Sequence, residues 1–283
     1  MYRYWETGKR RNDRSRGDVV DVMSELSRQH TMALPMDVLD HEIDFALQSR
    51  YGRPEQPRRQ QVFGVGMRHI TADRIEWPEL DLSALPGSDA DAAPGLRAQL
   101  TDELQLLVEG EILRAGSHTW QQVGFDHRNS DHAQQFIEFE NKVAALIEQH
   151  GLVGDDVELA VRGADFGDIR SPLEEALGRI GITYDEFVAD AGVRVISFID
   201  DLPTRYVTNV LRGAKHRQKQ AWEANDFVDI IALPVAAVYC DVVVTEKQWV
   251  HMMRQGKVEQ RYATQLRSST ADLVDVLVAA SVT

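Results

Sequence analysis

The chain has 283 residues, of which 43% are apolar, and a formal net charge of −14. This apolar content supports a large packed domain and excludes a mainly disordered or collagen-like chain. No run of apolar residues approaches the ~20 residues that span a bilayer. The single cysteine, Cys240, excludes an internal disulfide, and the absence of an apolar stretch after the N-terminal charges predicts a cytoplasmic protein without a signal peptide.

Two amphipathic helices are predicted near the N-terminus. The first covers residues 18–26, and the second begins at Pro35 with Leu39, Ile43 and Ala46 on one side. A loop is expected over residues 51–62, and the segment FGVGMRHI that follows it is predicted to be a short strand or a turn. Its Gly-x-Gly alone is too weak a signal for a phosphate-binding loop.

The middle of the chain is acidic and is predicted to be a helical block. Residues 61–200 carry a net charge of −16, whereas residues 1–60 and 201–283 carry +1 each. Apolar stripes predict three long helices, over residues 96–113, 136–147 and 171–187. The last of them has a capping-box sequence at Ser171-Pro172-Leu173-Glu174. Such a block would repel a polyanion, so a nucleic acid would dock at the nearly neutral ends.

A basic helix is predicted over residues 204–222. Two interpretations of it are open. It is either a solvated charged face, which is the usual role of such helices, or a phosphate-binding surface beside the acidic stretch that follows. In the second interpretation the nucleic acid contacts Arg205, Arg212, Lys215, Arg217 and Lys219.

A helix, a strand and a second helix are predicted by the stretch NDFVDIIALPVAAVYCDVVVTEKQWV. Asp226 can cap the first helix, whose first turn contains Asp229. Residues 241–245 form a short segment rich in β-branched residues, without alternation of polar and apolar side chains. This pattern is typical of a strand that is buried on both faces of a parallel sheet. Because ligands bind beyond the carboxyl ends of parallel strands, Thr245 and Glu246 mark a candidate site.

This stretch resembles the C-terminal half of the PIN-like nucleases, in which an acid stands at a helix start and a later strand ends in Thr before another acid. Asp229 and Thr245 have the separation typical of that family, and Glu246 takes the place of the second acid. Near the start of the chain, Tyr4-Trp5-Glu6-Thr7 is similar to the segment with a further family acid, which maps onto Glu6. The resemblance implies an α/β fold, a PIN-like parallel sheet flanked by helices, with a large acidic helical insertion.

The resemblance also implies three segments. Residues 1–70 are the N-terminal part of the PIN-like domain, residues 71–195 the acidic helical block or insertion, and residues 196–283 the C-terminal part. Two features depart from the family pattern. Five residues precede Glu6, so the first strand and its Asp are expected to be missing, and Pro234 is expected to kink the helix in which it falls.

The implied function is that of a metal-dependent ribonuclease, for example a toxin or a defence effector, with RNA as its partner. Hydrolysis of a phosphodiester needs charge neutralisation and an activated water, which Mg²⁺ or Mn²⁺ held by carboxylates supplies. The expected metal ligands are Asp229, Glu246 and Glu6, and Asp226 and Thr245 complete the catalytic group.

Each of these residues also has a structural interpretation. Asp229 can be a first-turn acid on a surface helix, Asp226 a cap, and Glu6 an ordinary surface residue. The chain can then be a catalytically inactive PIN-like module that binds RNA or protein, with the acidic helical block as the interface to a partner or a second copy. A third interpretation is a helical scaffold without an α/β site, which fails if residues 241–245 form a central strand.

Overall fold

The structure is a computed structural model in which residues 7, 10–52, 61–71, 94–116, 129–192 and 195–281 are described. Over these residues the chain is mainly helical and divides into two compact units. Unit 1 comprises Met1–Leu34 and Gln61–Asn129, and unit 2 comprises Pro35–Gln60 and Ser130–Thr283. Within the described ranges, none of the helices combines the length and the apolar character that crossing a bilayer requires.

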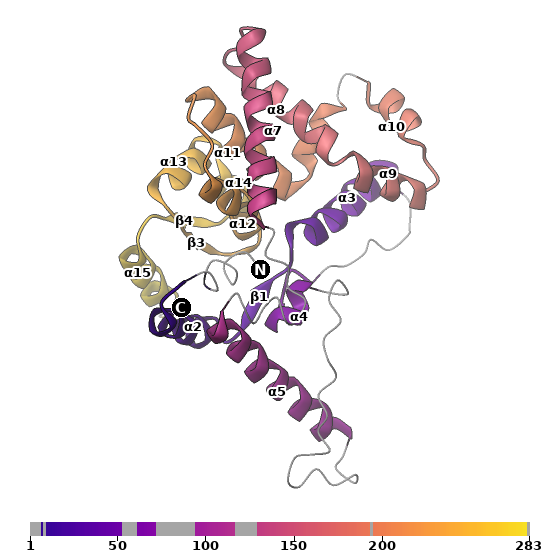
Figure 1. The fold of residues 1–283 in the computed structure, drawn as a ribbon. Helices are drawn as coiled ribbons and strands as arrows, with labels where there is room; N and C mark the ends of the chain where they lie inside the picture. The colour runs from indigo at the N-terminus through magenta and orange to yellow at the C-terminus, as the bar shows by residue number, and fades with distance from the viewer. Residues whose placement is uncertain are drawn as a thin grey trace. The chain divides into compact units, whose positions relative to one another are not determined.

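Unit 1 combines helices with a small antiparallel sheet. Its described elements are α2 (Asp13–Ser27), β1 (His30–Met32), β2 (Phe63–Val65), α4 (Gly66–Thr71) and α5 (Pro94–Ala115). Thr31 of β1 lies opposite Gly64 of β2, and α2 packs against α5 (Figure 1). Buried Arg16 of α2 donates hydrogen bonds to the carbonyl oxygens of Arg114 and Ala115. A cation therefore satisfies carbonyl groups that the C-terminus of α5 leaves without a partner in the helix.

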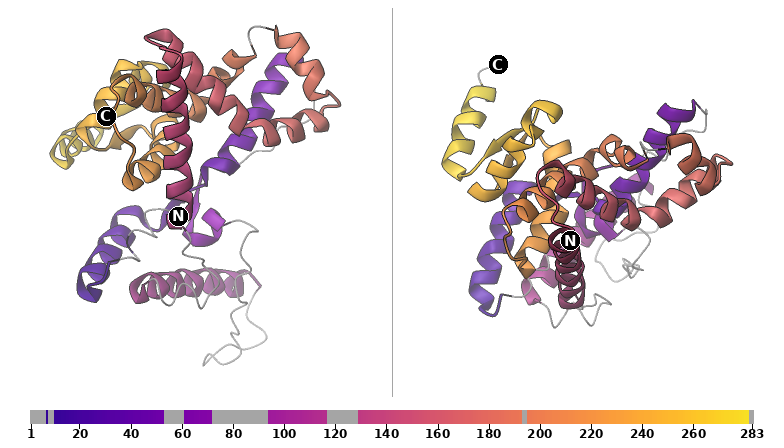
Figure 2. Two further views of the ribbon diagram at one scale, coloured as in Figure 1. Left: turned by 45° about the horizontal axis from the view of Figure 1, so that its top comes forward. Right: turned by 90° about the horizontal axis from the view of Figure 1, so that it is seen from above.

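Unit 2 is a helical assembly around α11. Its described elements are α3 (Pro35–Tyr51), α7 (Asn129–Gln149), α8 (Asp155–Asp168), α9 (Arg170–Arg179), α10 (Tyr184–Ala191), η4 (Ile196–Asp201), α11 (Pro203–Arg217), α12 (Ala224–Tyr239), β3 (Val242–Val244), α13 (Lys247–Gln255), α14 (Val258–Tyr262), β4 (Gln265–Arg267) and α15 (Thr270–Ser281). α11 contacts α3, α8, α12, α13 and η4, so most of its surface is covered by other helices. α3 lies alongside α9 (Figure 2).

Two apolar clusters stabilise unit 2. One joins α11, α12, α13 and the β3–β4 pair and includes Leu211, Trp249 and Leu266. The other joins α3, α9, α10 and η4 and includes Ile43 and Leu173. Full burial of a side chain of this size contributes ~1.5–3 kcal/mol, so each cluster is a large part of the folding free energy.

The predicted α/β fold with a PIN-like central parallel sheet is wrong. The described strands have three residues each and form two separate two-stranded sheets. The expected helix–strand–helix unit is present as α12, β3 and α13, and β3 pairs parallel with β4, but no other described strand joins this pair. Val243 is buried and Val244 is 37% exposed, so β3 buries one face. A run of valines is compatible with a strand that buries one face and with a strand that buries both. The composition of β3 therefore did not distinguish between the two.

Most of the predicted helices are confirmed, but one is divided in two. Residues 171–187 belong to α9 and α10, which are separated near Gly181, where a φ of +69° favours glycine. The capping box expected at Ser171 does not form, because α9 follows Ile169 without a side-chain cap. α10 has that motif instead, between Thr183 and Glu186. α12 continues through Pro234 to Tyr239.

Candidate functional site

Asp229 of α12 lies against the first turn of α13. The indole Nε1 of Trp249 donates a hydrogen bond of 3.0 Å to Asp229 Oδ2. Trp249 is fully buried in the first turn of α13, whose N-cap is Glu246. The carboxylate of Asp229, which is partly buried, is therefore held beside the helix start that follows β3.

Thr245 and Glu246 connect β3 to α13. The amide of Thr245 donates to the carbonyl oxygen of Arg267 at 3.0 Å, which extends the parallel pairing by one residue. Glu246 is exposed, and its carboxylate accepts a hydrogen bond of 3.1 Å from Gln248. Thr245 and Glu246 thus directly precede α13, the helix whose Trp249 contacts Asp229.

Asp226 is buried and closes the first turn of α12. Its Oδ2 accepts a hydrogen bond of 2.6 Å from the amide of Glu223 and forms an ion pair with Lys215. Glu223 is the N-cap and its side chain bonds back to the amide of Asp226, so the two residues form a reciprocal capping box. This geometry agrees with the capping interpretation of Asp226, and Lys215 neutralises its charge.

The predicted metal ligands are only partly described by the structure. Glu6 lies outside them, and among them no group of three or more His, Cys, Asp or Glu side chains could hold a metal ion. Asp229 and Glu246 are the predicted ligands that the structure describes, and their carboxylates accept hydrogen bonds from Trp249 and Gln248. Carboxylate oxygens suit Mg²⁺ or Mn²⁺, so Asp229 and Glu246 stay candidate ligands.

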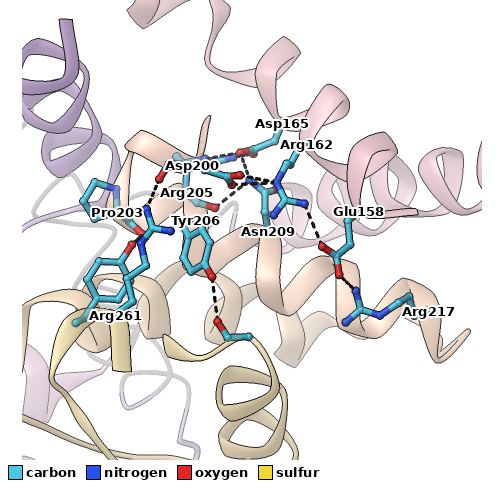
Figure 3. Close-up of polar contacts among 12 residues, drawn as sticks. Glu158, Arg162, Asp165, Asp200, Pro203, Arg205, Tyr206, Asn209, Arg217 and Arg261 are labelled. Atoms are coloured by element: carbon cyan, nitrogen blue, oxygen red, sulfur yellow. Dashed lines mark hydrogen bonds and ion pairs between the residues drawn. The ribbon is translucent and has the colours of Figure 1, made fainter. Parts of the chain in front are cut away.

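The basic helix α11 faces the interior of unit 2, where acids of the middle block neutralise it (Figure 3). Asp165 of α8 is fully buried and accepts hydrogen bonds from Arg205 at 3.1 Å, Arg212 at 3.2 Å and Asn209 at 2.7 Å. These donors satisfy the hydrogen-bonding capacity of a carboxylate that has no contact with water. The acidic block therefore has a structural use within unit 2.

Further contacts join the basic residues of α11 to acidic partners. Glu140 of α7 bridges Arg212, with 2.6 Å between Oε1 and Nε, and His216, with 2.7 Å between Oε2 and Nε2. Arg217 pairs with Glu158 of α8, and Lys215 pairs with Asp226. Arg212 and Lys215 are 2% and 4% exposed.

These positions correct the sequence interpretation of the basic helix. Arg212 and Lys215 were expected on a solvated face or against a nucleic acid, but both lie in the interior. Arg205 and Arg217 are engaged by Asp165 and Glu158, and Lys219 is exposed just beyond the helix. Sequence spacing identified the helix and its charges but not the acids that face them.

Glu42 of α3 is a buried carboxylate that sequence reasoning missed. Its oxygens accept hydrogen bonds from the amide of Thr204 at 3.0 Å and 3.1 Å, from the Thr204 hydroxyl at 2.7 Å and from the Tyr239 hydroxyl at 3.0 Å. Because Leu202 at the N-cap of α11 has no capping side chain, Glu42 caps that helix from a different helix. Burial raises the pKa of Glu42 to about 7, although the hydrogen bonds from Thr204 and Tyr239 oppose the rise. Burial and the nearby Glu42 also raise the pKa of Tyr239.

One sequence signal could have identified these acids. Glu42 follows Leu39 by three residues and precedes Ala46 by four, so it stands on the apolar stripe of its helix. Asp165 continues the buried stripe of Val161 in α8 in the same way. A carboxylate on an apolar stripe must be buried, and a buried carboxylate needs donors.

Comparisons of the chain with protein-family models, with curated proteins and with solved structures found no match. A proposal for the function therefore rests on the charges and the geometry of the described residues.

Proposed function

We propose that the chain is a divalent-cation-dependent ribonuclease that hydrolyses RNA phosphodiester bonds at the acidic residues around the start of α13. The observation that supports the proposal is the hydrogen bond from Trp249 to Asp229, which holds a carboxylate of α12 beside the residues that end β3. Thr245 and Glu246 lie at that same end of α13. Asp229 thus contacts the helix that has Glu246 as its N-cap, and this contact supports a shared role for the two carboxylates.

Asp229 and Glu246 would hold the cation, and Thr245 would contribute a hydroxyl group. When bound, Mg²⁺ or Mn²⁺ neutralises charge at a phosphate and makes a water more nucleophilic. The chain's own residues have separate tasks. Trp249 orients the Asp229 carboxylate, and Lys215 engages Asp226 in an ion pair.

The substitution Asp229→Asn tests the proposal. We expect it to abolish RNA cleavage in Mn²⁺ and to weaken Mn²⁺ binding measured by calorimetry, because it removes a ligand charge and retains the shape of the side chain. The matched control is Asp185→Asn, which removes one exposed carboxylate from the first turn of α10. A growth assay then tests a role as a toxin or defence effector. It compares the growth of cells that express the wild type with the growth of cells that express Asp229→Asn. Cleavage by Asp229→Asn at the wild-type rate would falsify the assignment.

A non-catalytic RNA- or protein-binding module is the second candidate. The observation that favours it is that the described part of the chain gathers no group of three possible metal ligands. This candidate predicts no RNA cleavage by the wild type in either Mg²⁺ or Mn²⁺, together with RNA or protein binding that persists in Asp229→Asn. Cation-dependent cleavage that Asp229→Asn removes would exclude it.

A further inference from the structure

The segment from Lys247 to Arg267 is a basic part of an acidic chain. It contains five Lys or Arg residues and one acid, Glu259, whereas the whole chain has a net charge of −14. Its elements are α13, α14 and β4. The Arg and Lys side chains of α11 form ion pairs with acids of unit 2. The segment from Lys247 to Arg267 is therefore the better candidate for a positively charged surface.

α13 presents Lys247, His251 and Arg254 on one side and packs through the other. Trp249, Val250, Met252 and Met253 are buried, which fixes the inner face. Lys247, His251 and Arg254 follow one another at helical spacings of four and three residues and are all exposed. They therefore form one row on the outer face, ~10 Å long at a rise of ~1.5 Å per residue.

Further cations continue the row towards β4. Arg254 donates to the carbonyl oxygen of Leu266 at 2.7 Å and contacts Glu259 at 2.9 Å. Burial would raise the pKa of Glu259, but the hydrogen bonds from Arg254 and the Leu266 amide and the charges of Arg254 and Arg267 lower it overall. Arg267 is thus close to the same carboxylate, and exposed Lys257 follows α13. Lys247, His251, Arg254, Lys257 and Arg267 are called the basic strip below.

The basic strip begins at the candidate site. Lys247 directly follows Glu246, and the amide of Thr245 bonds to the carbonyl oxygen of Arg267. Within the described part of the chain, neither Lys247 nor Lys257 forms an ion pair, in contrast to Lys215 in α11. These two ammonium groups are therefore available to an external anion.

We propose that the basic strip binds the phosphate backbone of single-stranded RNA and leads it to the residues at the start of α13. This inference rests on the proposed function for the identity of the polymer. The strip on α13 is one helix wide, and the neighbouring exposed residues, Gln248 and Gln255, are uncharged. One row of basic side chains matches one phosphate backbone, whereas a duplex presents two. Arg261 is outside the strip, because it donates to the carbonyl oxygen of Asp200 and stacks on Tyr206.

The test measures the fluorescence anisotropy of a labelled oligouridylate 12-mer in EDTA over a series of salt concentrations. The double substitution Lys247→Gln and Lys257→Gln removes the two unpaired cations. The matched control is Arg28→Gln with Lys142→Gln, which makes the same change of net charge at exposed positions on other elements. Thermal melting of all variants shows that each is folded.

We expect the strip variant to bind the 12-mer on the order of tenfold more weakly than the wild type at low salt. Each lost phosphate contact should reduce the slope of log Kd against log salt by ~0.7, so the two substitutions should reduce it by ~1.4. The control should bind like the wild type. The proposal is overturned if the strip variant binds normally, if both variants lose affinity equally, or if a 12-mer RNA duplex binds as tightly as the single strand.

The same experiment keeps this inference separate from the proposed function. Binding is measured without a divalent cation, and Asp229→Asn is included as a second protein. If that variant binds RNA through the strip while the wild type fails to cleave in Mn²⁺, the strip stands and the nuclease proposal fails. If the wild type cleaves while the strip variant binds normally, the nuclease proposal stands and the strip fails.

Discussion

The substitution Glu42→Gln tests whether one buried carboxylate limits the stability of unit 2 at neutral pH. Glu42 is 3% exposed and accepts hydrogen bonds from Thr204 and Tyr239. Gln has nearly the same shape and still provides an acceptor for the amide of Thr204, so the cap on α11 is retained. What the variant loses is the negative charge.

The pH dependence follows from the raised pKa. The pKa of Glu42 rises from an ordinary value of 4.5 to about 7 when the chain folds, so between these values the folded state binds more protons than the unfolded state. Stability therefore falls as the pH rises through this window, and it stays low above the window. At ~1.4 kcal/mol per pH unit the full loss is roughly 3 kcal/mol, of which about 2.5 kcal/mol falls between pH 5 and pH 8.5.

The measurement is urea unfolding of the wild type and Glu42→Gln at several pH values, followed through Trp222 and Trp249, which both lie in unit 2. The difference between the two unfolding free energies cancels the titration of the other groups. We expect the wild type to lose about 2.5 kcal/mol relative to the variant from pH 5 to pH 8.5. Carbon-13 NMR should show one carboxyl signal, absent from the variant, that titrates near pH 7.

Glu175→Gln on the exposed side of α9 is the control for a simple change of net charge. A difference between the wild type and Glu42→Gln that stays constant with pH would refute the reasoning. So would a Glu42 carboxyl signal that titrates near its ordinary pKa, since either result would mean that water reaches the carboxylate in the folded state.

Two further predictions concern the interior of unit 2. Asp165→Asn should lower the free energy of unfolding by ~3–5 kcal/mol, because Arg212 would keep its buried charge and lose one carboxylate partner. Urea unfolding measures this loss. A loss as small as that of the surface variant Asp185→Asn would contradict the prediction. Trp249→Phe keeps an apolar ring and removes the N–H group that donates a hydrogen bond to Asp229. The Mn²⁺ affinity measured by calorimetry should therefore fall by ~10–100-fold. An unchanged affinity would show that this hydrogen bond does not orient the carboxylate.

The helices were largely predictable because each depends on a local pattern. The apolar stripe from Pro35 onward is α3, and the helix expected before Asp241 is α12. Local patterns were less reliable at interruptions. Gly181 divides what looked like one amphipathic helix, because a left-handed residue ends a helix whatever the stripe around it indicates.

The candidate site was less predictable because its contacts join distant residues. Trp249 and Asp229 are on separate helices, and their contact depends on how α12 and α13 pack. Asp165 and Arg205 are further apart in the chain still, and neither has a local partner that reveals the other. A sequence read one segment at a time identifies charged residues, but their pairing depends on the tertiary structure.

The charges of unit 2 show why a basic helix is a poor guide to a nucleic-acid surface in this chain. Arg212 and Lys215 are buried, and a buried cation is tolerated when a carboxylate compensates its lost hydration. The acidic block supplies such carboxylates through Glu140 and Asp165, which explains part of its charge of −16 over residues 61–200. A polyanion competing for α11 would have to displace these partners and unpack the core. At Lys247 a polyanion would instead meet an ammonium group that forms no ion pair within the described residues, so binding there would displace no internal partner.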